Sequence, residues 1–394
     1  MLRKADENQP VVKATARIVA LDRARTFITL LVLIHHSVVN YTHFGSGDQM
    51  RWIGFDLVVL FNDSFFMACM FLISGLFVRG SLTRQGAADF IGKRAWRLGM
   101  PFLVSIFMLM PLAYYPTFLR YHLPGTTDFN FFHFWWHTLT MGPWPSGPAW
   151  FLWVLLALDI VAAMLWSFAP RVVTGLGRAI AALRNRPLTA FAAFLIFSVA
   201  SYVPMHLIFG DTSWLEPGGY PLPIQTSRIL LYAGYFFTGV GIGVVSLRAG
   251  ILAEDGEVAR RWRVWLAFAL LFYGAILVLV YAHHNWVDFN SPPQWWRACY
   301  GLVFALFSAA MTFTVLAISL RHAPSKFGLL DAVRPSAYGI FLTHYIFIIW
   351  LQYAVYDYSW PAVVKAAAVF AGTLALSWGV TALLRRIPLV ARMI

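Results

Sequence analysis

Arg25 and His36 are ionisable residues inside one long apolar stretch that runs from Arg17 to His43. Titratable groups inside a membrane span are costly, usually face the bundle interior or a water-filled cavity, and are candidates for a functional site. On an α-helix, their eleven-residue separation puts them within about 20° of one face and about 16 Å apart along the axis. A guanidinium suits phosphate or carboxylate ligands, and a neutral imidazole is a common general base. The spacing therefore predicts a functional site along this helix, with a cation at one level and a proton acceptor at another.

Two further polar side chains belong to the same stretch. Asp22 lies one helical turn before Arg25 and near the same stripe. It could orient Arg25 through a charge-assisted hydrogen bond, or simply neutralise Arg25 or Arg23. His35 points about 100° away from His36, so the two adjacent histidines do not share one helix face.

A basic cluster, Lys93, Arg94 and Arg97, stands immediately before Pro101. Arg94 and Arg97 are one helical turn apart and are therefore presented together. Juxtamembrane arginines often reflect membrane topology alone, with side chains that reach toward the interface. The alternative is an anion cradle for phosphates, which the planar fork of arginine suits.

Other apolar stretches also carry polar residues. Asn62, Asp63 and Ser64 lie in the outer half of the second stretch, where they could cap a helix or line a cavity. His344 lies in the ninth, either as a hydrogen-bonded interior residue or as part of a site.

The longest outer connection, from 116 to 149, is rich in aromatic rings. These rings could form an interfacial belt or offer flat faces to sugars. They are Phe118, Tyr121, Phe129, Phe131, Phe132, Phe134, Trp135, Trp136 and Trp144. His133 and His137 are four residues apart here, but without a third ligand in register no metal site is expected.

The composition places these residues in a membrane protein. Of 394 residues, 60% are hydrophobic and only 12% are charged, which is too apolar for a soluble domain of this length. The formal charge of +13 could suggest nucleic acid, but the basic residues follow membrane topology, so no nucleic-acid partner is expected and the bilayer is the expected environment.

Apolar runs of about 20 residues, long enough to cross a hydrocarbon core, occur ten times. They cover residues 18–40, 56–78, 99–115, 150–169, 188–209, 229–247, 263–283, 298–320, 336–356 and 361–384. The sequence therefore predicts an all-α polytopic membrane protein.

The distribution of basic residues predicts the orientation. With a cytoplasmic N-terminus, 23 of the 30 lysines and arginines fall on the inner side and five on the outer side. This favours ten helices with both termini in the cytoplasm. The expected organisation is a mobile N-terminus (1–16), one transmembrane domain (17–384) and a basic tail (385–394), with no cleaved signal peptide. The segment 171–186, with four arginines, is expected to be a solvated connection.

Small residues and cysteines are expected to serve packing. Gly239 and Gly243 have the spacing that lets two membrane helices approach closely. Cys69 and Cys299 both fall within predicted spans, so neither a disulfide framework nor a zinc spacing is present.

Five segments, in this order, resemble the membrane-bound acyltransferase-3 superfamily. They are LDRARTFITLLVLIHH, FFMACMFLISGLF, FIGKRAWRLGMPFL, PAWFLWVLL and SAYGIFLTHYIFI. The resemblance covers about residues 17 to 384. Within the superfamily, the LFND sequence that precedes the second segment and the overall length look most like the branch that includes the succinyltransferase of osmoregulated periplasmic glucans.

The resemblance implies an O-acyltransferase of the bacterial inner membrane. The donor would be a cytoplasmic acyl-CoA, either acetyl-CoA or succinyl-CoA, and the acceptor a hydroxyl of an extracytoplasmic glycan. No metal is expected, and the identities of acyl group and acceptor and the oligomeric state, including a homo-oligomer, stay open.

The resemblance assigns three site residues, and the others are candidates from their positions in the sequence. His36 corresponds to the catalytic histidine, and Asp22 is a second catalytic candidate through its link to Arg25. Arg94 and Arg97 correspond to residues that handle the acyl donor, and Arg25 and Lys93 are expected to join them. Candidate substrate-binding residues are Asp63, Trp150 and His344.

Two other functional classes compete with this interpretation. A transporter or flippase for a glycan or lipid-linked sugar could use the same intramembrane Asp, Arg and His residues. Such proteins often show broken helices paired across an inverted repeat, and no such halves are visible in the sequence. A purely structural assembly partner poorly explains these three residue types on one helix face.

Overall fold

The computed structural model describes residues 9–45, 47–121, 130–141, 147–211, 213–215, 222–244, 250–253, 256–286, 292–323 and 325–394. This part of the chain is a bundle of long helices, with one two-residue pair of antiparallel strands, β1 (Trp214–Leu215) and β2 (Ile224–Gln225). The expected all-α polytopic class is confirmed, because nine helical segments are long and apolar enough to cross a membrane.

The nine segments match the second to tenth apolar runs in order. Helices satisfy their own backbone hydrogen bonds, which is why apolar runs of this length form them in lipid. Their bounds are Ile53–Gln85, Ala87–Tyr121, Gly147–Phe168, Pro187–Phe209, Thr226–Val244, Trp262–Asn285, Gln294–Arg321, Gly328–Ala354 and Ala362–Leu384.

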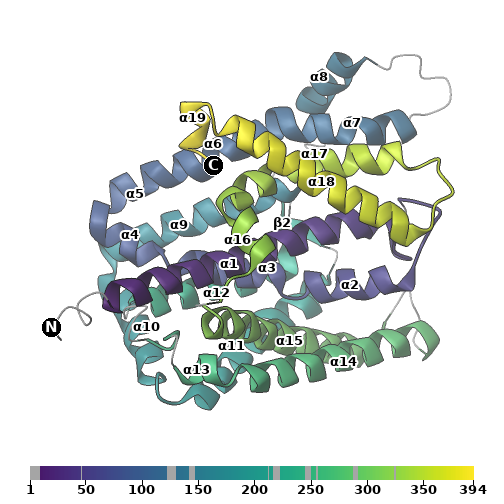
Figure 1. Cartoon of the computed structure of the whole chain (residues 1–394). Coiled ribbons are helices and arrows are strands. Elements are labelled where there is room, and N and C mark those ends of the chain that lie inside the picture. The colour runs from purple at the N-terminus through teal and green to yellow at the C-terminus, as the bar shows by residue number, and fades with distance from the viewer. Residues whose placement is uncertain are drawn as a thin grey trace.

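The first run forms α1 (Gln9–Val38), a helix of 30 residues. It is not among the nine because Asp22, Arg23, Arg25 and the two histidines lower its hydropathy. The helix begins inside the segment 1–16 that was expected to be mobile, and residues 1–8 lie outside the described part. In Figure 1, α1 (purple) crosses the middle of the bundle.

From residue 19 to its end, α1 has no fully exposed side chain and is covered by helices from later in the chain. It contacts α15 (Gln294–Arg321), α16 (Gly328–Val333), α17 (Ala337–Ala354) and α18 (Ala362–Leu384). It also contacts α2 (Ile53–Asp63) and α3 (Phe66–Gly75). The polar residues of α1 therefore face protein on several sides, as an intramembrane site requires.

The second and third spans are each built from several helical pieces. The second consists of α2, α3 and α4 (Val78–Gln85), separated by turns. The third consists of α5 (Ala87–Arg94), a π-turn η2 (Ala95–Gly99), α6 (Met100–Val104), a second π-turn η3 (Ser105–Leu109) and α7 (Met110–Tyr121). Such π-turns occur frequently at functional sites, and Arg97 lies in the first of them.

The remaining helices complete the bundle. They are α8 (Phe131–Met141), α9 (Trp150–Phe168), α10 (Pro170–Ala182), α11 (Pro187–Phe209), α12 (Ile229–Val244), α13 (Glu257–Arg260), α14 (Trp262–Trp286) and α19 (Pro388–Ala391). In the outer connection 116–149, α7 continues to Tyr121 and α8 follows. Residues 122–129 and 142–146, with Phe129 and Trp144, lie outside the described part.

The four arginines of the connection 171–186 are exposed, as expected for a solvated segment, but most of this connection is helix α10. Val173 and Gly177 are buried, and Gly177 faces Val244 of α12 so closely that a Cβ would overlap it. Apolar residues that recur every three to four positions give this helix a buried face, which orders the segment despite its arginines.

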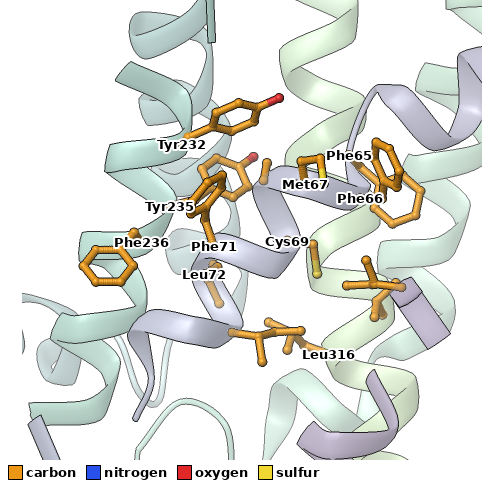
Figure 2. Packing of buried hydrophobic residues seen from close by; sticks show 14 of the residues in the cluster. Phe65, Phe66, Met67, Cys69, Phe71, Leu72, Tyr232, Tyr235, Phe236 and Leu316 are labelled. Atoms are coloured by element: carbon orange, nitrogen blue, oxygen red, sulfur yellow. The ribbon is translucent and has the colours of Figure 1, made fainter. Parts of the chain in front are cut away.

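Helices α3 and α12 pack with their backbones in contact. A Cβ at Gly75 would overlap the Phe236 carbonyl, and a Cβ at Gly239 or Gly243 would overlap the carbonyl of Leu72 or Leu76. The predicted packing role of Gly239 and Gly243 is confirmed. Figure 2 shows the surrounding core, in which Phe71 of α3 lies with its ring centroid 5.0 Å from that of Tyr232 of α12.

Candidate active site

A pocket of about 620 Å³ opens beside the middle of α1. Its walls come from α1, α3, the α5–η2 region, α9, α17 with the turn before it, and the residues after α18. The polar lining consists of Asp22, Arg25, Thr26, Thr29, Ser74, Arg94, Arg97, Arg334, Tyr338 and Arg385. Five arginines and one aspartate thus line one pocket, which we call the arginine pocket, and the excess of positive charge suits a polyanionic ligand.

Arg25 enters the arginine pocket from α1. Its Nη1 lies 3.4 Å from Asp22 Oδ1, and its guanidinium lies 4.4 Å from the ring centroid of Phe77. Both side chains of the pair are about one-third exposed. Asp22 therefore orients Arg25 from the same helix while leaving part of the guanidinium open to a ligand.

Arg23, two residues earlier, has a structural role instead. It forms a two-pronged ion pair with Asp331 of α16, at 2.7 and 2.8 Å, and donates to the Ala323 carbonyl at 2.9 Å. Because Asp331 lies on α16 and Ala323 follows α15, Arg23 ties α1 to later parts of the chain, and it does not line the pocket.

Arg94 and Arg97 are brought to the pocket together, as their spacing predicts. Arg94 Nε lies 3.2 Å from Oδ2 of Asp159, a carboxylate of α9 that is only 1% exposed. The Arg97 carbonyl accepts a hydrogen bond from the hydroxyl of Tyr338, which also lines the pocket. Asp159 therefore holds the Arg94 guanidinium, whereas Tyr338 holds the backbone of η2 at Arg97.

Lys93 is not brought into the pocket. Its Nζ donates to Gln85 Oε1 at 2.5 Å, and both groups are exposed. Adjacent positions on a helix point about 100° apart, so the helix turn that aims Arg94 inward directs Lys93 to the surface.

Three charged residues of this region were missed by sequence reasoning. Arg334 and Arg385 line the pocket, and Arg385 Nη1 donates to the Pro335 carbonyl at 2.8 Å. Asp159 lies behind Arg94. The two arginines look like ordinary topology-determining charges in the sequence, whereas an acid near the middle of an apolar run was a usable signal for Asp159.

His36 lies beyond the pocket, further along α1. The last α1 residue that lines the pocket is Thr29, and seven residues of helix place His36 about 10 Å further on. Its ring centroid lies 5.6 Å from that of His344 and 5.2 Å from that of Tyr345. The structure thus brings together His36 and His344, which are far apart in the sequence.

Asp22 and His36 lie at opposite ends of the site. Fourteen residues of α1 separate them, which corresponds to about 21 Å along the axis. Asp22 contacts Arg25, and at this distance it cannot orient the imidazole directly.

Asp63 and Trp150 lie outside the lining of the arginine pocket. Asp63 is paired with Arg228, whose Nη atoms lie 2.5 and 3.0 Å from its carboxylate oxygens. The ring of Trp150 stacks on that of Tyr232 with centroids 5.6 Å apart. In the described structure, Asp63 thus links α2 to the residue before α12, and Trp150 packs α9 against α12.

Comparison with known proteins identifies the family. Residues 18–382 match a family model described as an acyltransferase domain. No curated protein matches the chain. The family match decides for an enzyme and against the transporter and the structural assembly partner. Because the match covers nearly the whole chain, this protein belongs to the acyltransferase 3 family and is a membrane acyltransferase.

Proposed function

We propose that this protein moves an acyl group from a cytoplasmic acyl-CoA to a hydroxyl of an extracytoplasmic glycan, with His36 as the general base. The observation that carries the proposal is the arrangement along α1. A pocket with five arginines lies at one level of the helix, and a histidine pair lies further along it.

The charge of the arginine pocket supports a coenzyme A donor. Coenzyme A carries several phosphate charges, and arginine binds phosphate oxygens through two parallel hydrogen bonds. Arg25, Arg94 and Arg97 enter the pocket from two segments, and Arg334 and Arg385 face them from later ones. This end of the bundle is also where the positive-inside rule puts the cytoplasm.

The length of α1 between Arg25 and His36 supports the same donor. The rise of about 16 Å is comparable to the reach of a pantetheine arm. Phosphates held in the arginine pocket would therefore let the thioester carbonyl reach His36.

The reaction at His36 requires one proton acceptor. The neutral imidazole removes the proton of the acceptor hydroxyl as its oxygen attacks the thioester carbonyl. The carbon–sulfur bond then breaks, and the thiolate of coenzyme A takes the proton from the imidazolium. His36 returns to its neutral form, and the products are an ester and free coenzyme A.

The acceptor side of the proposal rests on aromatic residues at the other end of the bundle. The rings of Phe131 and Phe134 of α8 lie 5.1 and 5.6 Å from that of Tyr115 of α7, centroid to centroid. Flat apolar faces of this kind can pack against sugar rings. A glycan in the periplasm of a bacterium is the acceptor that fits this location, and the sequence resemblance adds a glucan as one candidate and succinyl, besides acetyl, as the group transferred.

The test uses purified protein in lipid nanodiscs with acetyl-CoA or succinyl-CoA and an extracted envelope glycan. We expect thiol release and ester formation with one of the donors, and loss of both in His36→Ala. Release of thiol at the same rate by wild type and His36→Ala would refute the role of His36. The absence of ester on any glycan, with transfer to lipid instead, would refute the acceptor.

A further inference from the structure

A second histidine, His344 of α17, lies beside His36, and one of its ring nitrogens has no hydrogen-bond partner among the described residues. The His344 ring is fully buried. Its Nδ1 lies 2.6 Å from the Phe341 carbonyl of the same helix. A carbonyl oxygen can only accept, so Nδ1 carries the proton.

This hydrogen bond fixes the tautomer of His344. In the neutral imidazole the other nitrogen, Nε2, then has a lone pair and accepts hydrogen bonds. Nε2 is buried and has no hydrogen-bond partner among the described residues. Leaving a buried acceptor unsatisfied is unfavourable, so a partner for this nitrogen is expected in the working enzyme.

The nearest ring that can supply a donor to this lone pair is His36. Two imidazoles joined by one N–H···N hydrogen bond of about 3 Å have ring centroids about 5 Å apart. The observed centroid separation is 5.6 Å and the planes are inclined by 36°. This separation is compatible with one N–H···N hydrogen bond between the two rings, formed by rotation of the His36 side chain.

We propose that His344 is a positioning residue that accepts a hydrogen bond at Nε2 from the protonated ring nitrogen of His36. This proposal rests on the proposed role of His36 as the base. The bond fixes which His36 nitrogen is free, and it directs that lone pair away from His344 and toward the acceptor hydroxyl. A third group that orients the base in this way is a general feature of acyl-transfer sites.

The bond strengthens during the reaction. When His36 takes the hydroxyl proton it becomes an imidazolium, and its N–H then makes a charge-assisted hydrogen bond, which is stronger than a neutral one. The neighbouring ring systems are His35 and Tyr345, with centroids 5.2 Å from that of His36. The Tyr345 hydroxyl already shares a hydrogen bond with that of Tyr114 at 3.3 Å, so on α17 the unpaired Nε2 lone pair of His344 is the acceptor for this N–H.

A water molecule is the competing partner for Nε2. A cavity of about 10 Å³ borders His344, Tyr345, Ser105 and Pro148, and a volume of about 10–15 Å³ is the minimum for one water. The experiment therefore has to distinguish His36 from water.

Substitution of His344 by glutamine or by asparagine distinguishes the roles of its two ring nitrogens. In His344→Gln the side-chain oxygen can occupy the place of Nε2, whereas in His344→Asn it can occupy only the place of Nδ1. His344→Leu removes both. We expect kcat to stay within about fivefold in His344→Gln and to fall about 100-fold in His344→Asn and His344→Leu, in the range that a general base contributes. The KM for acyl-CoA is expected to stay unchanged, because the arginine pocket is untouched.

The matched control is Thr343→Val. Thr343 is the buried neighbour on α17, and its hydroxyl donates only to the Gly339 carbonyl of its own helix in the described structure. This variant should keep wild-type kcat. Equal losses in the glutamine and asparagine variants, a change in KM alone, or no loss in His344→Leu would each overturn the proposal.

A measurement without turnover keeps the inference separate from the proposed function. With ¹⁵N-labelled histidine, NMR reports the Nε2 resonance of His344, assigned by its loss in His344→Gln. We expect this resonance to move in His36→Ala while that of Nδ1 stays in place. An unmoved Nε2 resonance would show that water is the partner and would overturn the proposal, whereas absent acyl transfer with a moved resonance would refute only the proposed function.

Discussion

Arg94 and Arg97 line the same pocket, but their replacement by methionine should have different consequences for stability. Arg94 lies 3.2 Å from Asp159, whose side chain is 1% exposed, whereas Arg97 has no carboxylate partner among the described residues. Methionine keeps the length of the side chain and removes the charge. Arg94→Met therefore leaves a buried carboxylate without its cation, and Arg97→Met does not.

The size of the effect follows from the geometry. Two unit charges 3.2 Å apart interact by about 5 kcal/mol at an effective dielectric constant of about 20. The Arg94 side chain is 23% exposed, so water offsets part of this energy, and breaking a buried pair costs about 3 kcal/mol at the lower end of measured values. For a chain of this size this corresponds to a decrease in Tm of about 4 °C.

The assay is thermal unfolding in nanodiscs, followed by intrinsic fluorescence, together with acyl-CoA binding. We expect both variants to bind the donor about tenfold more weakly, and only Arg94→Met to lose Tm. The double variant Arg94→Met/Asp159→Leu should recover most of the Tm, because an apolar pair can replace a buried ion pair, but it should not recover donor binding. An equal Tm in the two single variants would refute the role assigned to Asp159.

Three further predictions concern the pocket, the packing and the outer end. Lys93→Ala should leave the KM for acyl-CoA unchanged, since Lys93 contacts Gln85 outside the pocket; a KM increase equal to that of Arg97→Met would return it to the site. Gly239→Leu should prevent stable folding, measured as loss of a monodisperse peak in detergent, because a Cβ already overlaps the α3 backbone. Burial raises the pKa of Asp211, but the hydrogen bond from His206 and further favourable contacts outweigh it and hold this pKa below its ordinary value. This contribution is present above the ordinary pKa of about 3.9 and is lost as pH falls through the lower native pKa, so Tm should drop on acidification below about pH 4, and less so in Asp211→Asn.

Much of the fold could be predicted from the sequence because local hydropathy patterns determine where membrane helices form. Apolar runs of sufficient length gave nine spans and α1 in the right order. Helix geometry alone also predicts which face of α1 carries Arg25, and that Arg94 and Arg97 share one face. The close approach of α3 and α12 at Gly239 follows from small-residue spacing.

The rest of the site depends on contacts between helices that are distant in the sequence. Arg334 and Arg385 reach the pocket only because α17 and α18 pack around α1. Asp331 selects Arg23 as its partner across the bundle, which leaves Asp22 to Arg25. Local periodicity carries no information on such pairings, and the same holds for the proximity of His344 to His36.

In the proposed function, His36 is the general base for the acylation of a glycan. The most direct test of this claim is mass spectrometry of envelope glycans from cells that carry wild-type protein, the His36→Ala variant or no protein, with His35→Ala as the control on the neighbouring helix face. We predict a mass increment of one acyl group on a glycan with wild type and with His35→Ala, and none in the other two strains. The same increment in the His36→Ala strain, or no increment with wild type, would contradict the claim.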